Sequence, residues 1–383
     1  MDIESKSKPN PRRTSLRDRI TAIKWGYFSI SMATGGIAVL LYNTPHQFTG
    51  LETIGKIVYI FNLVLFLLTS ILITIRFSFP GELKESFNHP NETHFVGTCP
   101  LALATIIMGA SVYGTPACGL WLIVALRVVF WIYVAIAILQ AVFHNWHLYN
   151  NHMASEQPFA IVRLLPSFPA MLGGTIASVL ASDQPQKHAL NIIVGGLTLQ
   201  GFGITMCLFV YAEYFYRMNK SGLPKKEERL EMFIAVGPWS FTALALIGMA
   251  NAAVEKFPDT YFLTSAIEGS QVVVSAGQIA LVLASLVAIF LWLLAFFCFC
   301  IALISVLSVA KIFGGEGRVH TSLPYWSMVF PNTGFVIATV RIGTVLESEA
   351  VLWVSSVMTV IQVAAWLGVG IASVRKFLKG EML

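Results

Sequence analysis

The chain has 383 residues, of which 56% are hydrophobic and only 12% are charged, and its formal net charge is +5. Soluble globular domains average about 25% charged residues, so the composition excludes a soluble protein and predicts a polytopic membrane protein. The positive charge does not indicate nucleic-acid binding, because most basic residues lie in loops between apolar runs without interleaved aromatic residues.

Ten apolar runs are long enough to cross a bilayer as helices. In chain order they cover residues 21–42, 57–75, 95–113, 119–142, 159–181, 190–216, 231–251, 274–310, 324–345 and 351–374. The eighth run is too long for one perpendicular span, so we expect it to tilt or to project beyond the bilayer. The sequence therefore predicts an all-α integral membrane protein with a ten-helix domain at residues 21–376, between tails at residues 1–20 and 377–383.

The distribution of Lys and Arg indicates the orientation of these spans. If both tails are cytoplasmic, most of the 25 basic residues lie on the cytoplasmic side, and only Lys56, Lys187 and Lys256 lie in the opposite loops. Because positive charge concentrates on the cytoplasmic side of membrane proteins, we expect both termini in the cytoplasm. The plasma membrane is the default location.

Prolines recur in the odd-numbered runs and are absent from the even-numbered ones. The recurring positions are Pro100, Pro169, Pro238 and Pro331, and the first three follow a regular 69-residue spacing (100, 169, 238). The same step back from Pro100 reaches Ser31, and this alignment matches Gly35-Gly36 with Gly173-Gly174. Because proline breaks helices, we expect five copies of a two-helix hairpin, each with one helix broken at these prolines and glycines and one regular helix.

Broken helices free backbone groups, which are tolerated at membrane depth only inside the protein or beside a water-filled cavity. We therefore expect the five odd-numbered helices to line a central pore and the even-numbered helices to face lipid. Each repeat contains two spans, so the repeats run parallel to one another.

The ninth run combines a ring and a cation on one helix face. Phe330 precedes Pro331, and Arg341 follows Phe330 by eleven residues, about 16 Å along a helix. An arginine inside a span is costly and usually marks a substrate path, and its guanidinium binds a carboxylate bidentately. We predict that Arg341 binds substrate and Phe330 is a gate. Phe168, which holds the same pre-proline position in the fifth run, is a candidate second constriction.

Four further cations are candidates for contact with the substrate, and each has a structural alternative. Arg163 forms either a substrate contact or an ion pair, and Lys24 either reaches the pore or snorkels to the membrane surface. Arg127 touches substrate or braces an inner helix, and Arg76 binds substrate or anchors the topology. Near the helix breaks, hydroxyl and amide groups either bind the anion or satisfy freed backbone: Thr34, Ser167, Ser240, Thr242, Asn332 and Thr333. Glu213 is an acid of the kind that proton coupling requires, although simple exposure explains it as well.

Several of these segments resemble the tellurite-resistance/dicarboxylate transporter family. They are Phe330-Pro331, the glycine pairs, Gly237-Pro-Trp-Ser-Phe-Thr and Trp326-Ser-Met-Val-Phe-Pro-Asn-Thr-Gly-Phe. The last two look most like the fungal malic-acid permease branch. The resemblance covers residues 20–376 and implies ten helices around five inner ones, a phenylalanine of the ninth helix occluding the pore, and an oligomer (trimer or dimer). The buried cations differ from the related slow anion channels, whose pores are nearly free of fixed charge.

These observations favour a secondary transporter that moves C4-dicarboxylates such as malate and succinate together with protons. An anion channel of the slow-anion-channel type and a sulfite efflux pump are the alternatives. The sequence contains no nucleotide-binding, metal-ligand or nucleophile motif, so we expect neither enzymatic activity nor a metal or other cofactor.

Overall fold

The computed structural model describes residues 16–151, 161–258, 275–309 and 323–379. Residues 1–15 and 380–383 of the two predicted tails, and residues 159–160, 274 and 310 at the ends of two predicted spans, lie outside these ranges. The described part of the chain consists of helices and their connecting turns and contains no strand, which confirms the all-α prediction. Nine of its helical segments are long and apolar enough to cross a membrane.

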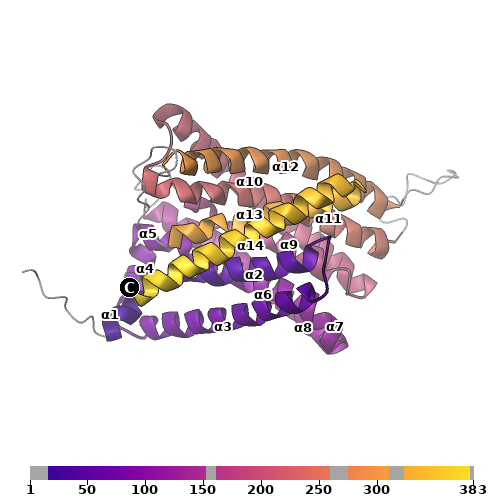
Figure 1. Ribbon diagram of the computed structural model, residues 1–383. Coiled ribbons are helices and arrows are strands. Elements are labelled where there is room, and N and C mark those ends of the chain that lie inside the picture. The colour runs from indigo at the N-terminus through magenta and orange to yellow at the C-terminus, as the bar shows by residue number, and fades with distance from the viewer. Residues whose placement is uncertain (1–15, 152–160, 259–274, 310–322, 380–383) are drawn as a thin grey trace, which may run out of the picture.

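The elements follow one another in a single series of helices (Figure 1). They are α1 (Leu16–Thr21), η1 (Trp25–Tyr27), α2 (Phe28–Asn43), α3 (Leu51–Phe77), α4 (Glu82–Asn88), α5 (Pro90–Thr93), η2 (His94–Gly97), α6 (Thr98–Gly109), η3 (Ala110–Gly114), α7 (Thr115–Cys118), α8 (Leu120–Asn150), η5 (Ile161–Leu164), α9 (Phe168–Leu180), α10 (Gln186–Ser221), η6 (Lys226–Val236), α11 (Gly237–Lys256), α12 (Ala276–Leu307), η8 (Leu323–Met328), α13 (Phe330–Val345) and α14 (Glu349–Leu378).

The predicted fifth span is the run that differs most from expectation. Its regular part, α9, has only 13 residues, about 20 Å of helix, against about 30 Å for the hydrocarbon core of a bilayer. The 3₁₀ turn η5 precedes it, and two prolines, Pro166 and Pro169, separate the turn from the body of the helix. The fifth run is therefore a short helix preceded by a separate turn.

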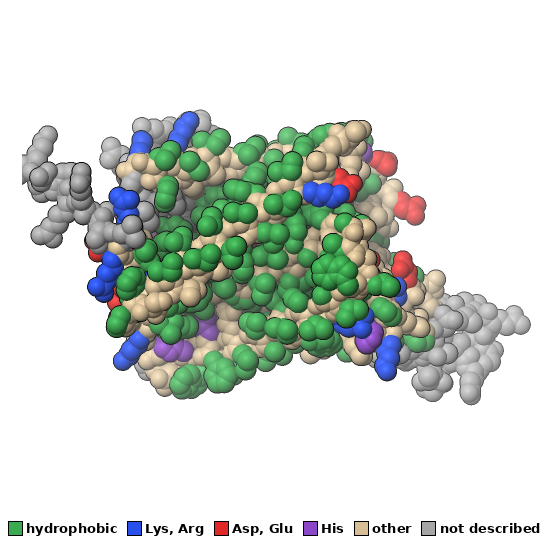
Figure 2. All heavy atoms as spheres, turned by 90° about the horizontal axis from the view of Figure 1, so that it is seen from below, with side chains coloured by type: hydrophobic (Ala, Val, Ile, Leu, Met, Phe, Trp, Pro, Cys, Tyr) green, Lys and Arg blue, Asp and Glu red, His purple; other side chains and the backbone are tan. Residues whose placement is uncertain are grey.

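Burial alternates along the chain between two sets of helices. The inner set is α2, α6, α9, α11 and α13, and the outer set is α3, α8, α10, α12 and α14. In the most apolar window of each segment, 94% of the residues are buried for η6 with α11, but only 17% for α3. The outer helices carry most of the exposed large apolar side chains, which cover the middle of the molecule between its more charged ends (Figure 2).

The inner helices form a closed ring. Going round it, α2 contacts α6, α6 contacts α9, α9 contacts α11, α11 contacts α13, and α13 returns to α2. Each outer helix packs against two neighbours of this ring: α3 against α2 and α6, α8 against α6 and α9, α10 against α9 and α11, α12 against α11 and α13, and α14 against α13 and α2. A space on the axis of the ring is consequently bordered by all five inner helices.

The predicted helix breaks occur at the starts of the inner helices. The residues before α2, α6, α11 and α13 form 3₁₀ turns, and Pro169, Pro238 and Pro331 each occupy the first turn of their α-helix. Proline fits there because an N–H in the first turn has no partner within the helix. The prolines therefore begin inner helices rather than kink them in the middle.

The paired glycines do not break their helices, contrary to our expectation for Gly35, Gly36, Gly173 and Gly174. Helices α2 and α9 continue through them without interruption. Their role is close packing: a Cβ added at Gly35 would lie 2.5 Å from Asn62 Nδ2 of α3, and one at Gly174 would lie 2.7 Å from Gln200 Cβ of α10. The absence of a side chain lets neighbouring helices approach.

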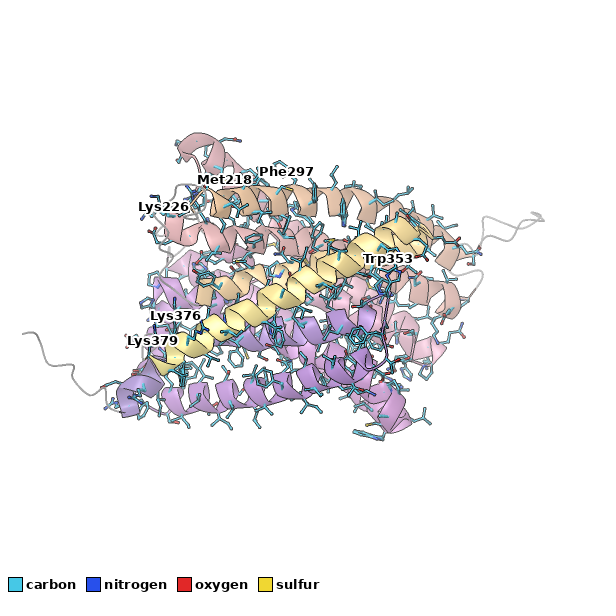
Figure 3. The ribbon with its side chains drawn as sticks, in the orientation of Figure 1. Met218, Lys226, Phe297, Trp353, Lys376 and Lys379 are labelled. Carbon is cyan, nitrogen blue, oxygen red and sulfur yellow. The ribbon has the colours of Figure 1, made fainter. Side chains whose placement is uncertain are left out.

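The two ends of the described chain lie at the same end of the bundle. Helix α1 and the C-terminal end of α14 both lie there (Figure 1). Lys226, Lys376 and Lys379 lie near that end, while Trp353 lies toward the other (Figure 3). We call these ends the terminal face and the opposite face. All five inner helices begin at the end nearer the terminal face and run toward the opposite face.

Candidate functional site

A small cavity lies on the axis of the inner ring, with side chains from all five inner helices around it. Its walls are Gly36, Val39 and Asn43 of α2, Met108 of α6, Thr175, Ser178 and Val179 of α9, Phe241 and Leu244 of α11, and Phe330, Thr333, Ile337 and Arg341 of α13. We call it the central cavity. Its volume is about 20 Å³, which is enough for a single water molecule and too small for a dicarboxylate.

Three phenylalanine rings close the central cavity toward the terminal face. Phe330 stacks on Phe241 with 4.8 Å between ring centroids, and Phe168 lies 5.9 Å from Phe241 and 6.4 Å from Phe330. None of the three residues is more than 3% exposed. Because the rings come from α9, α11 and α13, this aromatic plug ties together the starts of three neighbouring inner helices.

Each ring of the aromatic plug rests on a glycine of the next helix around the ring. A Cβ added at Gly237 would lie 2.8 Å from Phe168 Cζ, one at Gly334 would lie 2.7 Å from Phe241 Cε2, and one at Gly36 would lie 3.2 Å from Phe330 Cδ2. Distances below 3.0 Å do not occur for real Cβ atoms, so a methyl group at Gly237 or Gly334 would displace the ring. These glycines act as sockets that fix the positions of the rings.

Phe241 is the ring that sequence reasoning did not single out. Phe168 and Phe330 both lie immediately before an aligned proline. In α11 that position is Gly237, which receives the Phe168 ring, and the aromatic residue comes three positions after Pro238 instead. The signal in the sequence is a matched pair of positions. Phe241 lies three residues after Pro238, and Gly334, which receives its ring, lies three residues after Pro331.

Arg341 lies at the other end of the central cavity, toward the opposite face. Its Nη2 donates to Asn43 Oδ1 at 3.3 Å, and no carboxylate in the described ranges lies within ion-pair distance of it. Thr175, whose buried hydroxyl has no hydrogen-bond partner among the described residues, lines the same cavity. A guanidinium inside a span is costly without a compensating charge, and the described residues supply Arg341 with none.

The hydroxyl and amide candidates near the helix starts mostly satisfy backbone groups. Thr333 lines the central cavity, and its hydroxyl donates to Val329 O at 2.9 Å. Asn332 donates to Met328 O at 2.7 Å. Thr34 donates to Ile30 O and accepts a bond from Trp366 Nε1 of α14 at 3.2 Å, so it is turned toward an outer helix. Of these predicted residues, the structure brings Thr333 to the cavity.

Arg163 belongs to a different place in the molecule. Its Nη1 donates to Glu213 Oε2 at 2.5 Å, and Glu213 Oε1 accepts from Arg217 Nη2 at 2.5 Å. Arg163 and Glu213 border a pocket of about 210 Å³ formed by α8, η5 and α10. Of the two alternatives considered for Arg163, the structure shows the ion pair.

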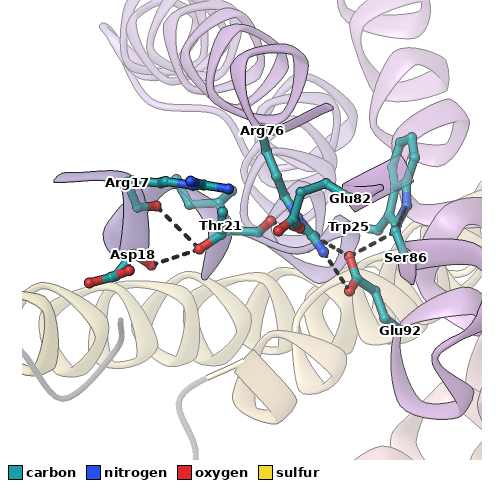
Figure 4. Close-up of polar contacts among 9 residues, drawn as sticks. Arg17, Asp18, Thr21, Trp25, Arg76, Glu82, Ser86 and Glu92 are labelled. Atoms are coloured by element: carbon teal, nitrogen blue, oxygen red, sulfur yellow. Dashed lines mark hydrogen bonds and ion pairs between the residues drawn. The ribbon is translucent and has the colours of Figure 1, made fainter. Parts of the chain in front are cut away.

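Arg76 is buried in an ionic network near the terminal face (Figure 4). Its guanidinium pairs with Glu92 and with Glu82, the latter at 3.0 Å, and also donates to Ile23 O. Ser86 links Glu92 to the indole of Trp25. Two carboxylates compensate this cation, which fastens the end of α3 to α4, α5 and η1.

Breaking this network is expected to destabilise the protein. In Arg76→Met, two carboxylates lose their buried partner, which we expect to cost about 3–5 kcal/mol. Lys56→Met is the matched control, because the exposed Lys56–Glu52 pair contributes at most about 0.5 kcal/mol. Thermal unfolding in detergent should show a clearly lower melting temperature for Arg76→Met and little change for the control. Equal melting temperatures would show that the network contributes no net stability.

The two remaining cations also lie away from the central cavity. Arg127 Nε donates to Gln184 Oε1 at 2.8 Å, and Gln184 Nε2 donates to Ile123 O at 3.0 Å, so Arg127 braces α8 against the segment after α9. Lys24 is exposed next to η1. Among the five cations considered from the sequence, Arg341 is the one that lines the central cavity.

Comparisons with known proteins agree with this architecture. The SLAC1 family model, described as a voltage-dependent anion channel, matches residues 22–374. A malic acid transport protein of Schizosaccharomyces pombe is 32% identical over 368 residues, which cover 96% of this chain and 81% of that protein. A second protein of the same yeast, named as a putative malic acid transport protein, is 32% identical over 372 residues, covering 97% and 83%. A sulfite efflux pump of Arthroderma benhamiae is 26% identical over 362 residues, covering 93% and 91%.

Proposed function

Because the chain belongs to the SLAC1 family of voltage-dependent anion channels, we propose that it is a secondary transporter that carries C4-dicarboxylates such as malate and succinate through its central cavity. The match confirms the family resemblance found in the sequence. Family and relatives support an integral membrane protein that transports anions. One observation supports dicarboxylates as the substrate. The Arg341 guanidinium lies in a cavity bordered by all five inner helices and has no carboxylate partner among the described residues.

The chemistry of the Arg341 end suits a carboxylate. A guanidinium presents paired N–H donors that match the two oxygens of a carboxylate. The hydroxyl of Thr175, which bonds to no described residue, is a further donor on the same cavity. The two relatives named for malic acid transport are more similar in sequence to this chain than the sulfite efflux pump is. This difference supports dicarboxylates over sulfite.

The aromatic plug is the proposed gate. In its closed form the central cavity holds about 20 Å³, so a dicarboxylate enters only if the rings of Phe330, Phe168 and Phe241 move apart. Hydrophobic constrictions of this kind close a pore by excluding water. The glycine sockets support the proposal because each gives a ring one defined resting place.

We propose that the inner and outer helices together form five parallel hairpin repeats. Each repeat is an inner helix followed by an outer one, and η5 with α9 is the third inner helix. The closed sequence of contacts round the ring and the alternation of burial support this arrangement. In the same proposal both termini are cytoplasmic, the membrane is the plasma membrane, and the protein forms a homo-oligomer, a trimer or a dimer.

Proton coupling completes the proposed mechanism. Moving a dianion into a cell against an inside-negative potential of 100 mV costs about 4.6 kcal/mol, at about 2.3 kcal/mol per charge. Protons that enter with the anion offset this charge and supply a driving force. Uptake of malate into proteoliposomes should therefore increase when the outside is acidic and disappear when a protonophore removes the gradient.

An anion channel is the second candidate, because the matching family model carries that description. A channel passes chloride or nitrate down its gradient as a current that does not saturate at low concentrations. A transporter shows saturable uptake of malate and little current. Recording both from the same reconstituted protein separates the two candidates.

Ligand-dependent stability tests the substrate class directly. A ligand that binds the folded state stabilises it by about 2.7 kcal/mol at one hundred times its dissociation constant. We expect malate and succinate to raise the melting temperature of the purified protein, and chloride and sulfite at equal ionic strength to leave it nearly unchanged. A rise with sulfite alone would replace the dicarboxylate proposal with sulfite efflux.

A further inference from the structure

A second pocket lies outside the inner ring, between the outer helices α8 and α10 and the turn η5. Its volume is about 210 Å³, roughly ten times that of the central cavity. Polar groups line one part of it, and Leu148, Met206 and Val210 line the rest. Tyr149 and Phe209, which are 60% and 68% exposed, also border it. The pocket therefore opens on the outer surface of the bundle.

His94 is an unsatisfied donor in the wall of this lateral pocket. The residue is 0% exposed, and neither ring nitrogen has a hydrogen-bond partner in the part of the chain that the structure describes. An imidazole carries at least one N–H donor, and leaving a buried donor unpaired costs about 1–3 kcal/mol. Buried polar groups are nearly always paired, so His94 indicates a missing partner in the pocket.

Arg163 and Ser167 are donors of the lateral pocket with spare capacity, beside the Glu213 carboxylate. Arg163 uses Nη1 on Glu213, while its Nη2 and Nε groups bond to no described residue. Ser167 Oγ accepts from Asn145 Nδ2 at 3.1 Å and donates to no described acceptor. Glu213 pairs with Arg163 in the pocket and also with Arg217, which is not among the lining residues, so the three groups together carry one net positive charge. Donors with net positive charge suit an oxyanion.

We propose that the lateral pocket binds the phosphate or carboxylate group of an acidic ligand through Arg163, Ser167 and His94, at a site separate from the central cavity. An acidic phospholipid headgroup and a soluble anion offer the same oxyanion. Ser167 directly precedes Phe168 of the aromatic plug, so the bound group touches the residue next to one gate ring. Occupancy of the pocket is thus expected to influence the gate.

Binding can be tested on the full-length purified protein without measuring transport. Inorganic phosphate is titrated while the melting temperature is followed, and the lipids that remain bound after reconstitution in phosphatidylcholine with phosphatidic acid are identified by native mass spectrometry. A rise with phosphate supports the site with a soluble anion as its source. Retained phosphatidic acid supports it with a headgroup as its source. Neither effect in the wild-type protein would refute the proposal.

Variants assign the binding to this pocket. Arg163→Gln should weaken binding at least tenfold, and Ser167→Ala, which leaves the Arg163–Glu213 ion pair in place, should weaken it in the same direction. Arg127→Gln removes a cation bonded elsewhere and should not change it. Arg341→Gln should also keep the binding, which separates this site from the proposed transport function. Equal binding in the wild type, Arg163→Gln and Ser167→Ala would overturn the proposal.

Discussion

Replacing Arg341 with glutamine is expected to raise the malate concentration for half-maximal uptake by about 10- to 100-fold, since a hydrogen bond to a charged group contributes about 1.5–3 kcal/mol. The guanidinium has no carboxylate partner among the described residues, and its described hydrogen bond goes to a neutral amide, Asn43. Its charge is therefore available to a substrate anion in the central cavity. The measurement is radiolabelled malate uptake into proteoliposomes across a range of concentrations.

Two further variants make the Arg341 result specific. Arg341→Lys keeps the charge but loses the planar pair of donors, so we expect uptake between that of the wild type and that of Arg341→Gln. Arg127→Gln applies the same change to an arginine that lies within another span and braces α8 through Gln184. It should transport with nearly wild-type affinity. Unchanged affinity in Arg341→Gln would remove this residue from the substrate path and, with it, the main support for a dicarboxylate.

The all-helical class and most of the candidate membrane helices could be predicted from the sequence, because they depend on local features. Apolar runs report which segments span the membrane, and prolines mark the starts of α9, α11 and α13 because their missing N–H is tolerated only there. The length of the fifth span could not be predicted from hydropathy, since Pro166 and Pro169 divide an apolar run into η5 and α9.

The candidate site could be predicted only where one segment carries the whole signal. Phe330 and Arg341 share α13, and both line the central cavity. The other cations looked alike in the sequence because their partners are far away: Glu213 lies 50 residues from Arg163, and Gln184 lies 57 residues from Arg127. Whether a buried cation has a partner depends on residues that are distant in the sequence. The pattern of apolar residues does not indicate which of them lie next to the cation in the fold.

The aromatic plug shows the same limit in its packing. Two of its rings share the pre-proline position and could be aligned. The position of the third ring, Phe241, depends on the space that Gly334 leaves on the neighbouring helix α13. Asn43 and Thr175 were missed for a similar reason, because their polar groups matter only where α2 and α9 meet Arg341 across the cavity.

Removing the Phe330 ring is expected to turn the closed transporter into a leaky one. Phe330 contacts both other rings of the aromatic plug and rests on Gly36, so Phe330→Ala opens a gap in the constriction. Each 1.4 kcal/mol removed from a barrier raises a rate about tenfold, and we expect anion flux without a proton gradient to rise by at least that factor. Planar-bilayer current and passive malate efflux from liposomes both measure it.

The socket variant tests the same gate without removing a ring. A methyl group at Gly334 would lie 2.7 Å from Phe241 Cε2, so Gly334→Ala must displace that ring from its stacking position against Phe330. We expect flux that differs from the wild type, with a smaller change than in Phe330→Ala. A double variant, Phe330→Ala with Phe241→Ala, should leak more than either single change, because two adjoining rings are then missing.

Phe335→Ala is the matched control for the Phe330 variant. Phe335 is equally a buried ring of α13, at 3% exposed, but it packs against Trp292 and Phe299 of the outer helix α12. Truncating a buried phenylalanine costs about 3–5 kcal/mol at either position, so both variants lose similar stability while only Phe330→Ala opens the axis. A leak of equal size in both would trace the flux to general loosening, and a tight Phe330→Ala protein would show that the closure lies elsewhere along the inner ring.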